Sequence, residues 1–152
     1  MKRKNSTFAF FIAAAALATT AYARTTLTPS LPSGTKGEIV RVAVHFQSDE
    51  AVVGARFDVV FDPAVLAPGG IEKGEALADH QVFDDQDTSG KVSLTLLSMT
   101  NAELNSGTLA TVSFTLLADV PEGTEVISLP EENTILVAKD GNTKSHEAIQ
   151  KI

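Results

Sequence analysis

The sequence predicts an all-β sandwich, because apolar residues recur at every second position and turn residues separate these runs. The first such run is 40–46, where four apolar side chains alternate with Arg41, Ala43 and His45. Three later segments share this period, with apolar positions at Ala55, Phe57, Val59, Phe61; Val92, Leu94, Leu96; and Val112, Phe114, Leu116. Antiparallel sheet with one buried and one solvated face produces this pattern.

Shorter strands are expected near both ends of the chain, at 25–31, 125–129, 134–138 and 144–149. Asp140-Gly141 is a tight-turn dipeptide between the last two of these strands. One helical turn is expected after Asp62, which can cap it, while Pro63 suits its first position. The acidic stretch 84–87 is predicted to be a charged loop. About eight or nine short strands therefore make up the expected sandwich.

Residues 1–23 are predicted to be a secretory signal peptide. Lys2-Arg3-Lys4 precedes an unbroken apolar run over 8–18, and Ala21-Tyr22-Ala23 supplies the small residues of a cleavage site. The run is too short to span a bilayer comfortably, so a membrane anchor is not expected. A single domain over 24–152 would then be released into a periplasm or the medium.

Charge and composition limit the partners of this domain. It holds nine Lys and Arg against nineteen Asp and Glu, a net charge of −10. Such a chain is repelled by nucleic acid and anionic lipid, and it suits a basic or neutral partner. The sequence has no Cys, so the domain must be stabilised by packing and not by disulfides.

Neither a catalytic site nor a strong metal site is evident. The three His are far apart in the sequence, and no nucleophile elbow or Gly-rich phosphate loop is present, so we expect a non-enzymatic protein. Asp85-x-Asp87-x-Ser89-Gly90 matches the opening of an EF-hand loop, but Leu96 stands where its closing Glu should be. A looser calcium site built from Asp84, Asp85 and Asp87 is the remaining candidate, with a plain polar loop as the alternative.

Sugar binding by aromatic stacking is disfavoured by composition. The segment 24–152 has no Trp and no Tyr, and its five Phe mostly take inward positions of their strands. Flat Trp and Tyr rings are the usual platforms for pyranose rings. Binding of a polysaccharide through hydrogen bonds stays open.

Three segments resemble the cohesin family in sequence and order. They are 55–66 (ARFDVVFDPAVL), with its Phe-Asp-Pro-x-x-Leu turn, 90–97 (GKVSLTLL) and 107–116 (GTLATVSFTL). The likeness covers about residues 26–150. It implies a jelly-roll β-sandwich of about nine strands and, as its activity, binding to a dockerin-like protein domain, in a family associated with polysaccharide breakdown.

The resemblance also implies a binding face, the outward side of the sheet that contains the Asp-Pro strand. Its expected residues are Gly54, Arg56, Asp58, Val60, Ser93, Thr95 and Leu97. The Asn-x-Asp recognition pair of the best-known cohesins falls here on Gly54 and Arg56, so a dockerin of that class would meet a cation in place of a carboxylate. Two other functions remain as alternatives: a carbohydrate-binding domain without an aromatic platform, and a structural subunit that assembles through its sheet edges.

Overall fold

The computed structural model describes residues 25–87, 89–139, 143–144 and 149–150. Its strands are β1 (Thr25–Pro29), β2 (Ile39–Ser48), β3 (Val52–Phe61), β4 (Leu66–Lys73), β5 (Gln81–Asp87), β6 (Lys91–Leu97), β7 (Gly107–Leu116), β8 (Ile127–Ser128), β9 (Ile135–Ala138), β10 (Thr143–Lys144) and β11 (Ile149–Gln150). The helical content of the described residues is the 3₁₀ turn η1 (Glu131–Asn133). The predicted signal peptide lies outside these residues.

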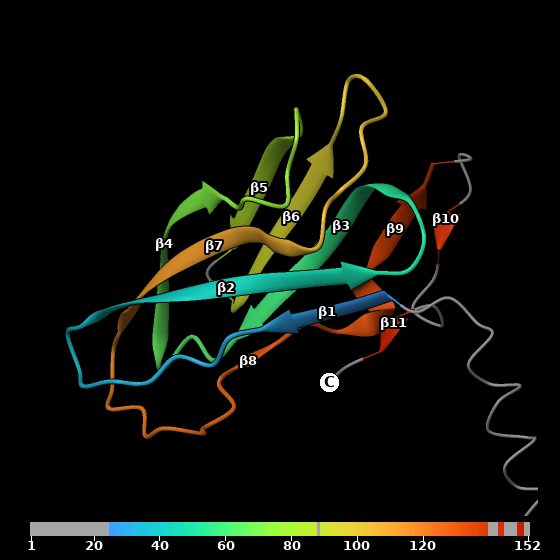
Figure 1. The fold of residues 1–152 in the computed structure, drawn as a ribbon. Helices are drawn as coiled ribbons and strands as arrows, with labels where there is room; N and C mark the ends of the chain where they lie inside the picture. The colour runs from blue at the N-terminus through green and yellow to red at the C-terminus, as the bar shows by residue number, and fades with distance from the viewer. Residues whose placement is uncertain (1–24, 88, 140–142, 145–148, 151–152) are drawn as a thin grey trace, which may run out of the picture.

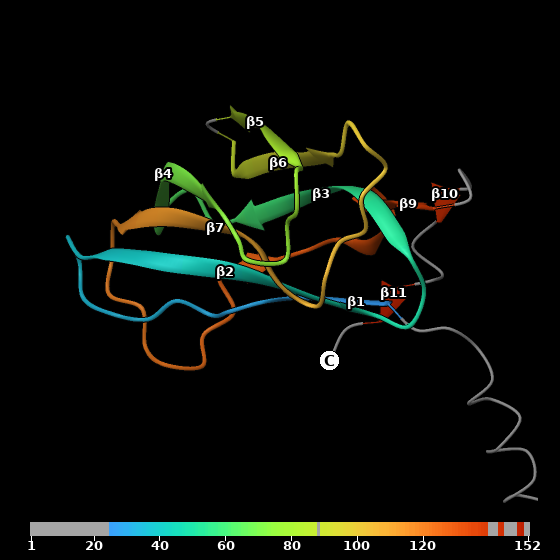
Figure 2. The ribbon, with the colours of Figure 1, turned by 45° about the horizontal axis from the view of Figure 1, so that its top comes forward.

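Two sheets stack face to face and confirm the predicted jelly-roll sandwich (Figure 1, Figure 2). The first sheet has the order β11-β1-β2-β7-β4, and the second has the order β10-β9-β3-β6-β5 with β8 also pairing with β3. All described pairs are antiparallel except β1 with β11. The chain passes repeatedly from one sheet to the other, so strands distant in sequence become neighbours. None of the helices described is long and apolar enough to cross a membrane.

The core lies between the sheets and contains the alternating residues that predicted it. Phe57 and Phe114 are fully buried, and the ring of Phe114 meets that of Phe61 edge to face, with 5.1 Å between centroids. The other inward residues of the four predicted runs are buried too, apart from Val40, which is partly buried. Each large apolar side chain buried in this way contributes about 1.5–3 kcal/mol relative to an exposed one.

The turn after Asp62 forms much as predicted. Ala64 N donates to Asp62 Oδ1 at 2.9 Å, and Val65 N and Leu66 N both donate to the main-chain oxygen of Asp62. The segment is a single capped turn that leads directly into β4, and not a helix. It inserts Leu66 into the core, where this side chain is almost fully buried.

Two strands were not expected, and one prediction was wrong. Residues 66–73 form β4, which pairs with β7 around an irregularity between Pro68 and Ile71. The acidic stretch 84–87, predicted to be a loop, belongs to β5 at the edge of the second sheet. Charged side chains suit such a strand, because they discourage edge-to-edge association. The strand expected at 125–129 is reduced to the two residues of β8.

Candidate functional site

The candidate site is the outer face of the second sheet, defined as the outward surface of β9, β3, β6 and β5. Strand register places one residue from each strand side by side: Ile135 pairs with Arg56, Arg56 with Thr95, and Thr95 with Phe83. Directly paired residues in antiparallel strands project to the same side of a sheet. We call these four residues the transverse row. At about 4.8 Å between strands, it spans about 14 Å.

Arg56 is exposed near the middle of the transverse row. Neither an ion pair nor a hydrogen bond joins its side chain to any residue that the structure describes. The same face holds Asp58, two residues further along β3, and Asp85, which pairs with Ser93. The Asp58 carboxylate accepts a hydrogen bond from Ser93 Oγ at 2.7 Å. The guanidinium of Arg56 is therefore free to bind an external group.

All seven residues expected on the binding face do lie on one side of the sheet, but they are not equally accessible. Arg56 and Leu97 are exposed, and Val60, Ser93 and Thr95 are partly exposed, whereas Gly54 and Asp58 are buried. Asp58 is 7% exposed, and its carboxylate already accepts the Ser93 hydroxyl. Their part in binding stays a proposal.

Gly54 is buried at an irregularity between β3 and β9. A Cβ added there would lie 3.1 Å from the main-chain oxygen of Leu96 and 3.8 Å from Val137 Cβ. The first distance is tighter than ordinary packing, so a side chain at this position would push neighbouring backbone aside. The close approach of β6 and β9 to β3 thus explains why this position holds a glycine.

Apolar side chains flank Arg56, and sequence reasoning missed two of them. Phe83 is 53% exposed, Leu97 48% and Ile135 44%. The outward surface of the first sheet also has an exposed apolar residue, Ile39, at 73%. There Ala43 pairs with Thr111, and an exposed ion pair joins Arg41 to Glu72. The sequence could have indicated an outward Phe83, because it follows the apolar Val82, which faces inward. The acidic residues after Phe83 suggested a loop instead.

A braced loop follows β6 beside this face. Asp79 accepts hydrogen bonds from Ser98 Oγ at 2.6 Å and from Thr100 Oγ1 at 2.5 Å, and these bonds lower the pKa of the Asp79 carboxyl. Ser98 Oγ in turn accepts the main-chain N–H of Ala102 at 2.8 Å. Met99 lies between the two residues that Asp79 holds, and its side chain is 82% exposed.

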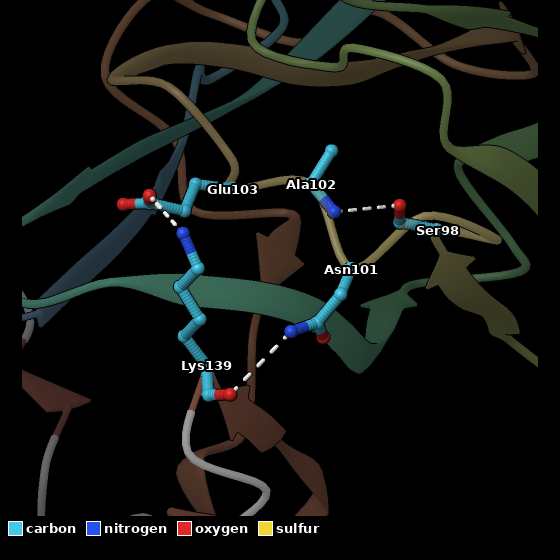
Figure 3. Close-up of polar contacts among 5 residues, drawn as sticks. All are labelled: Ser98, Asn101, Ala102, Glu103 and Lys139. Carbon is cyan, nitrogen blue, oxygen red and sulfur yellow. Dashed lines mark hydrogen bonds and ion pairs between the residues drawn. The ribbon is translucent and has the colours of Figure 1, made fainter.

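The far end of the same loop is tied to the end of β9 (Figure 3). Asn101, which has a φ of +59°, points its Nδ2 at the main-chain oxygen of Lys139 at 3.5 Å. Lys139 Nζ reaches Glu103 Oε2 at 3.0 Å. The loop that carries the exposed Met99 thus makes hydrogen bonds with Asp79 before β5 and with the main chain after β9.

The proposed calcium ligands Asp84, Asp85 and Asp87 lie along β5. Asp84 and Asp85 are consecutive in an extended strand, so their side chains project to opposite faces of the sheet. Gln86 Nε2 donates to Asp84 Oδ2 at 3.4 Å and to Gly69 O at 3.0 Å. Among the described side chains, no three acidic or His groups gather into a metal site. The side chain of Asp87 is outside that description, and the calcium site stays a prediction.

Several solved structures share the fold at low sequence identity. A type II cohesin A11 from Bacteroides cellulosolvens matches with a TM-score of 0.70 and 16% identity, over 84% of this chain and 95% of that one. A non-cellulosomal cohesin from Archaeoglobus fulgidus matches with a TM-score of 0.68 and 14% identity, over 85% and 86%. The sixth cohesin of Acetivibrio cellulolyticus scaffoldin B, in complex with a Cel5 dockerin mutant, gives 0.69 and 15%, over 85% and 94%.

Comparison with curated protein sequences finds no match. A family model does match, and it covers residues 25–149 with the description "Cohesin domain". This range includes both sheets except Gln150 at the end of β11, and it includes every residue of the outer face described above. The sandwich, the Asp-Pro turn and the family match agree, and the chain belongs to the cohesin domain family.

Proposed function

We propose that the mature chain is a secreted or periplasmic, non-catalytic module that recruits a dockerin-like domain or another exported protein through the outer face of its second sheet. The observation that carries this proposal is the exposure of Phe83, Leu97 and Ile135 around Arg56. Aromatic residues and Arg are enriched in the cores of protein interfaces, and buried anchors of this kind supply most of the binding energy. We further propose that the recruited protein acts in polysaccharide breakdown.

The choice of a protein partner is supported by the chemistry of the face. Nucleic acid and anionic membranes are disfavoured by the net charge of −7 for the whole chain. A sugar platform is disfavoured because Phe83 is the one aromatic side chain exposed among the described residues. Three of the similar structures are complexes of a cohesin with a dockerin, which favours a dockerin-like partner here.

Gly54 and Arg56 argue against a dockerin that requires Asn and Asp at these positions. An amide and a carboxylate would be replaced by no side chain and by a cation, so polar groups of that dockerin would be left unpaired. Burying an unpaired polar group costs about 1–3 kcal/mol, and more for a charged one. The proposed partner is therefore of a different specificity class.

The test is a binding measurement with purified 24–152 immobilised on a sensor. Dockerin domains encoded in the source genome are passed over it with calcium and again with a chelator, and retention on insoluble polysaccharide is measured in parallel. The variant Leu97→Asp places a charge in the outer face, and Thr115→Asp does the same on the exposed surface of β7 in the other sheet.

We expect a dockerin to bind the wild-type protein, Leu97→Asp to weaken the affinity at least tenfold, and Thr115→Asp to leave it within about twofold. Equal loss in both variants would place the interface elsewhere. Glycan retention with no dockerin bound would favour the carbohydrate-binding alternative. Concentration-dependent oligomers in the absence of any partner would favour the assembly alternative.

A further inference from the structure

We infer that the partner presents a single carboxylate surrounded by apolar side chains, and that Arg56 is the residue that selects it. This inference rests on the proposed function and names the chemistry of its partner. Arg56 has an apolar neighbour in the transverse row, Ile135, and the row ends at Phe83. A complementary partner surface must therefore place a negative charge opposite Arg56 and apolar groups around that charge.

Among the described residues, no carboxylate pairs with Arg56. The nearest acid on the same face of β3 is Asp58, which is buried and already accepts the Ser93 hydroxyl at 2.7 Å. Asp85 pairs with Ser93 and lies two strands away from β3, about 10 Å across the sheet. By contrast, Arg41 on the other sheet forms an ion pair with Glu72 at 2.9 Å. Arg41 thus has a counter-charge among the described residues, whereas Arg56 has none.

An unpaired guanidinium that becomes covered by a partner must gain a counter-charge. Burial of a charge without one costs several kcal/mol, whereas a bidentate pair with a carboxylate satisfies the planar fork of Arg. The fork would be covered here because apolar groups on both sides draw the partner surface close to the sheet. A contact that buries Leu97 and Phe83 also covers Arg56, so the partner must supply a carboxylate that pairs with the Arg56 guanidinium.

The surrounding charges favour one carboxylate over a polyanion. Asp58 and Asp85 lie on the same face as Arg56, and the chain is acidic as a whole. A phosphate chain or nucleic acid would be repelled by these groups after satisfying one Arg. A lone Asp or Glu side chain brings one negative charge to one positive charge. The observations thus favour an acidic side chain of a protein.

The test uses a phage-displayed library of a small helical scaffold, randomised over one surface, as the binding probe. Clones are selected on immobilised 24–152, and those that still bind Leu97→Asp are discarded, which keeps only binders of the outer face. The retained clones are sequenced and measured against Arg56→Glu. Lys73→Glu, an equal charge change at an exposed position of β4, is the matched control.

We expect the retained clones to be enriched in Asp or Glu flanked by Leu, Ile or Phe. Arg56→Glu should weaken their affinity at least about thirtyfold, and Lys73→Glu should leave it within about twofold. Selection on Arg56→Glu should instead enrich Lys or Arg at the central position. Clones without an acidic preference, or clones that bind Arg56→Glu as well as wild type, would overturn the inference, as would recovery of no clone that depends on Leu97.

This selection needs no natural partner, so its outcome is independent of the dockerin measurement. If dockerins fail to bind while the acidic preference and its reversal are found, the recruitment proposal fails and the chemistry of Arg56 stands. If a dockerin binds but is insensitive to Arg56→Glu, the recruitment proposal stands and this inference fails.

Discussion

Replacement of the buried His80 by Ala should destabilise the domain strongly. His80 is 1% exposed, and its two ring nitrogens bridge the β4–β5 connection to β3. Ala78 N donates to Nδ1 at 3.2 Å, which requires an unprotonated Nδ1, so the ring proton is on Nε2 and donates to Val53 O at 2.9 Å. Both partners, the N–H of Ala78 and the carbonyl of Val53, are main-chain groups, and His80→Ala would remove the hydrogen bond that each makes with the ring.

The expected loss follows from three contributions. Each hydrogen bond contributes about 1 kcal/mol net, and a buried partner left unsatisfied costs about 1–3 kcal/mol. Removal of the ring adds a cavity term. Because the surroundings relax in part, we expect a loss of about 3–5 kcal/mol. At about 3–5 °C per kcal/mol for a domain of this size, the midpoint should fall by about 10–20 °C.

The assay is thermal and urea unfolding of 24–152 followed by circular dichroism. His80→Asn keeps an acceptor near the position of Nδ1 but cannot reach Val53, so it should lose about half as much stability as His80→Ala. His45→Ala is the control, since His45 is exposed and its one described side-chain hydrogen bond is with Thr108 Oγ1 at 3.3 Å. If His80→Ala and His45→Ala both stayed within about 0.5 kcal/mol of wild type, the argument from buried hydrogen bonds would be refuted.

Three further results are expected. Gly90→Ala should cost about 1–3 kcal/mol in thermal melts, because Gly90 has a φ of +110° and an added Cβ would lie 2.5 Å from the last carbonyl of β3, whereas Gly70→Ala, with open space around it, should be nearly neutral; equal effects would contradict this. The hydrogen bonds that lower the pKa of Asp79 below its ordinary value of 3.8 stabilise the loop after β6 above that value, and this stabilisation should be lost as the pH falls through the lowered pKa. Amide exchange of the loop should rise there in wild type but not in Asp79→Asn. Lys139→Ala should change stability by less than about 0.5 kcal/mol in urea unfolding, because its ion pair with Glu103 is exposed; a larger loss would show that it braces the loop.

The sequence was sufficient to predict the core but not the sheet order. Alternation in 55–61 and 112–116 placed Phe57 and Phe114 inside, because a strand that buries one face must follow a period of two. Asp62 and Pro63 predicted the turn into β4, because Asp can cap such a turn and Pro suits its first position. Which strands lie side by side depends on contacts between distant segments, and no local pattern carries that information.

The sequence patterns of β4 and β5 were weak for physical reasons, and both strands were missed. β4 contains Pro68 followed by two glycines, which usually mark a turn, but an edge strand with an irregular register tolerates them. β5 has one inward apolar residue, Val82, and then a series of acids. Both strands lie at sheet edges, where fewer neighbours constrain the sequence. The exposed Phe83 was missed together with the strand that positions it.

Gly54, Arg56 and Asp58 are three of the four β3 residues on the outer face, and the fold uses two of these three internally. Gly54 is used for the close approach of β6 and β9, since a side chain there would meet Leu96 O at 3.1 Å. The carboxylate of Asp58 is used within the sheet by its bond to Ser93. Arg56, in contrast, makes no side-chain hydrogen bond or ion pair with any residue that the structure describes. We therefore propose that the specificity of this cohesin domain depends less on the number of polar residues on the face than on which of them the sheet leaves unsatisfied.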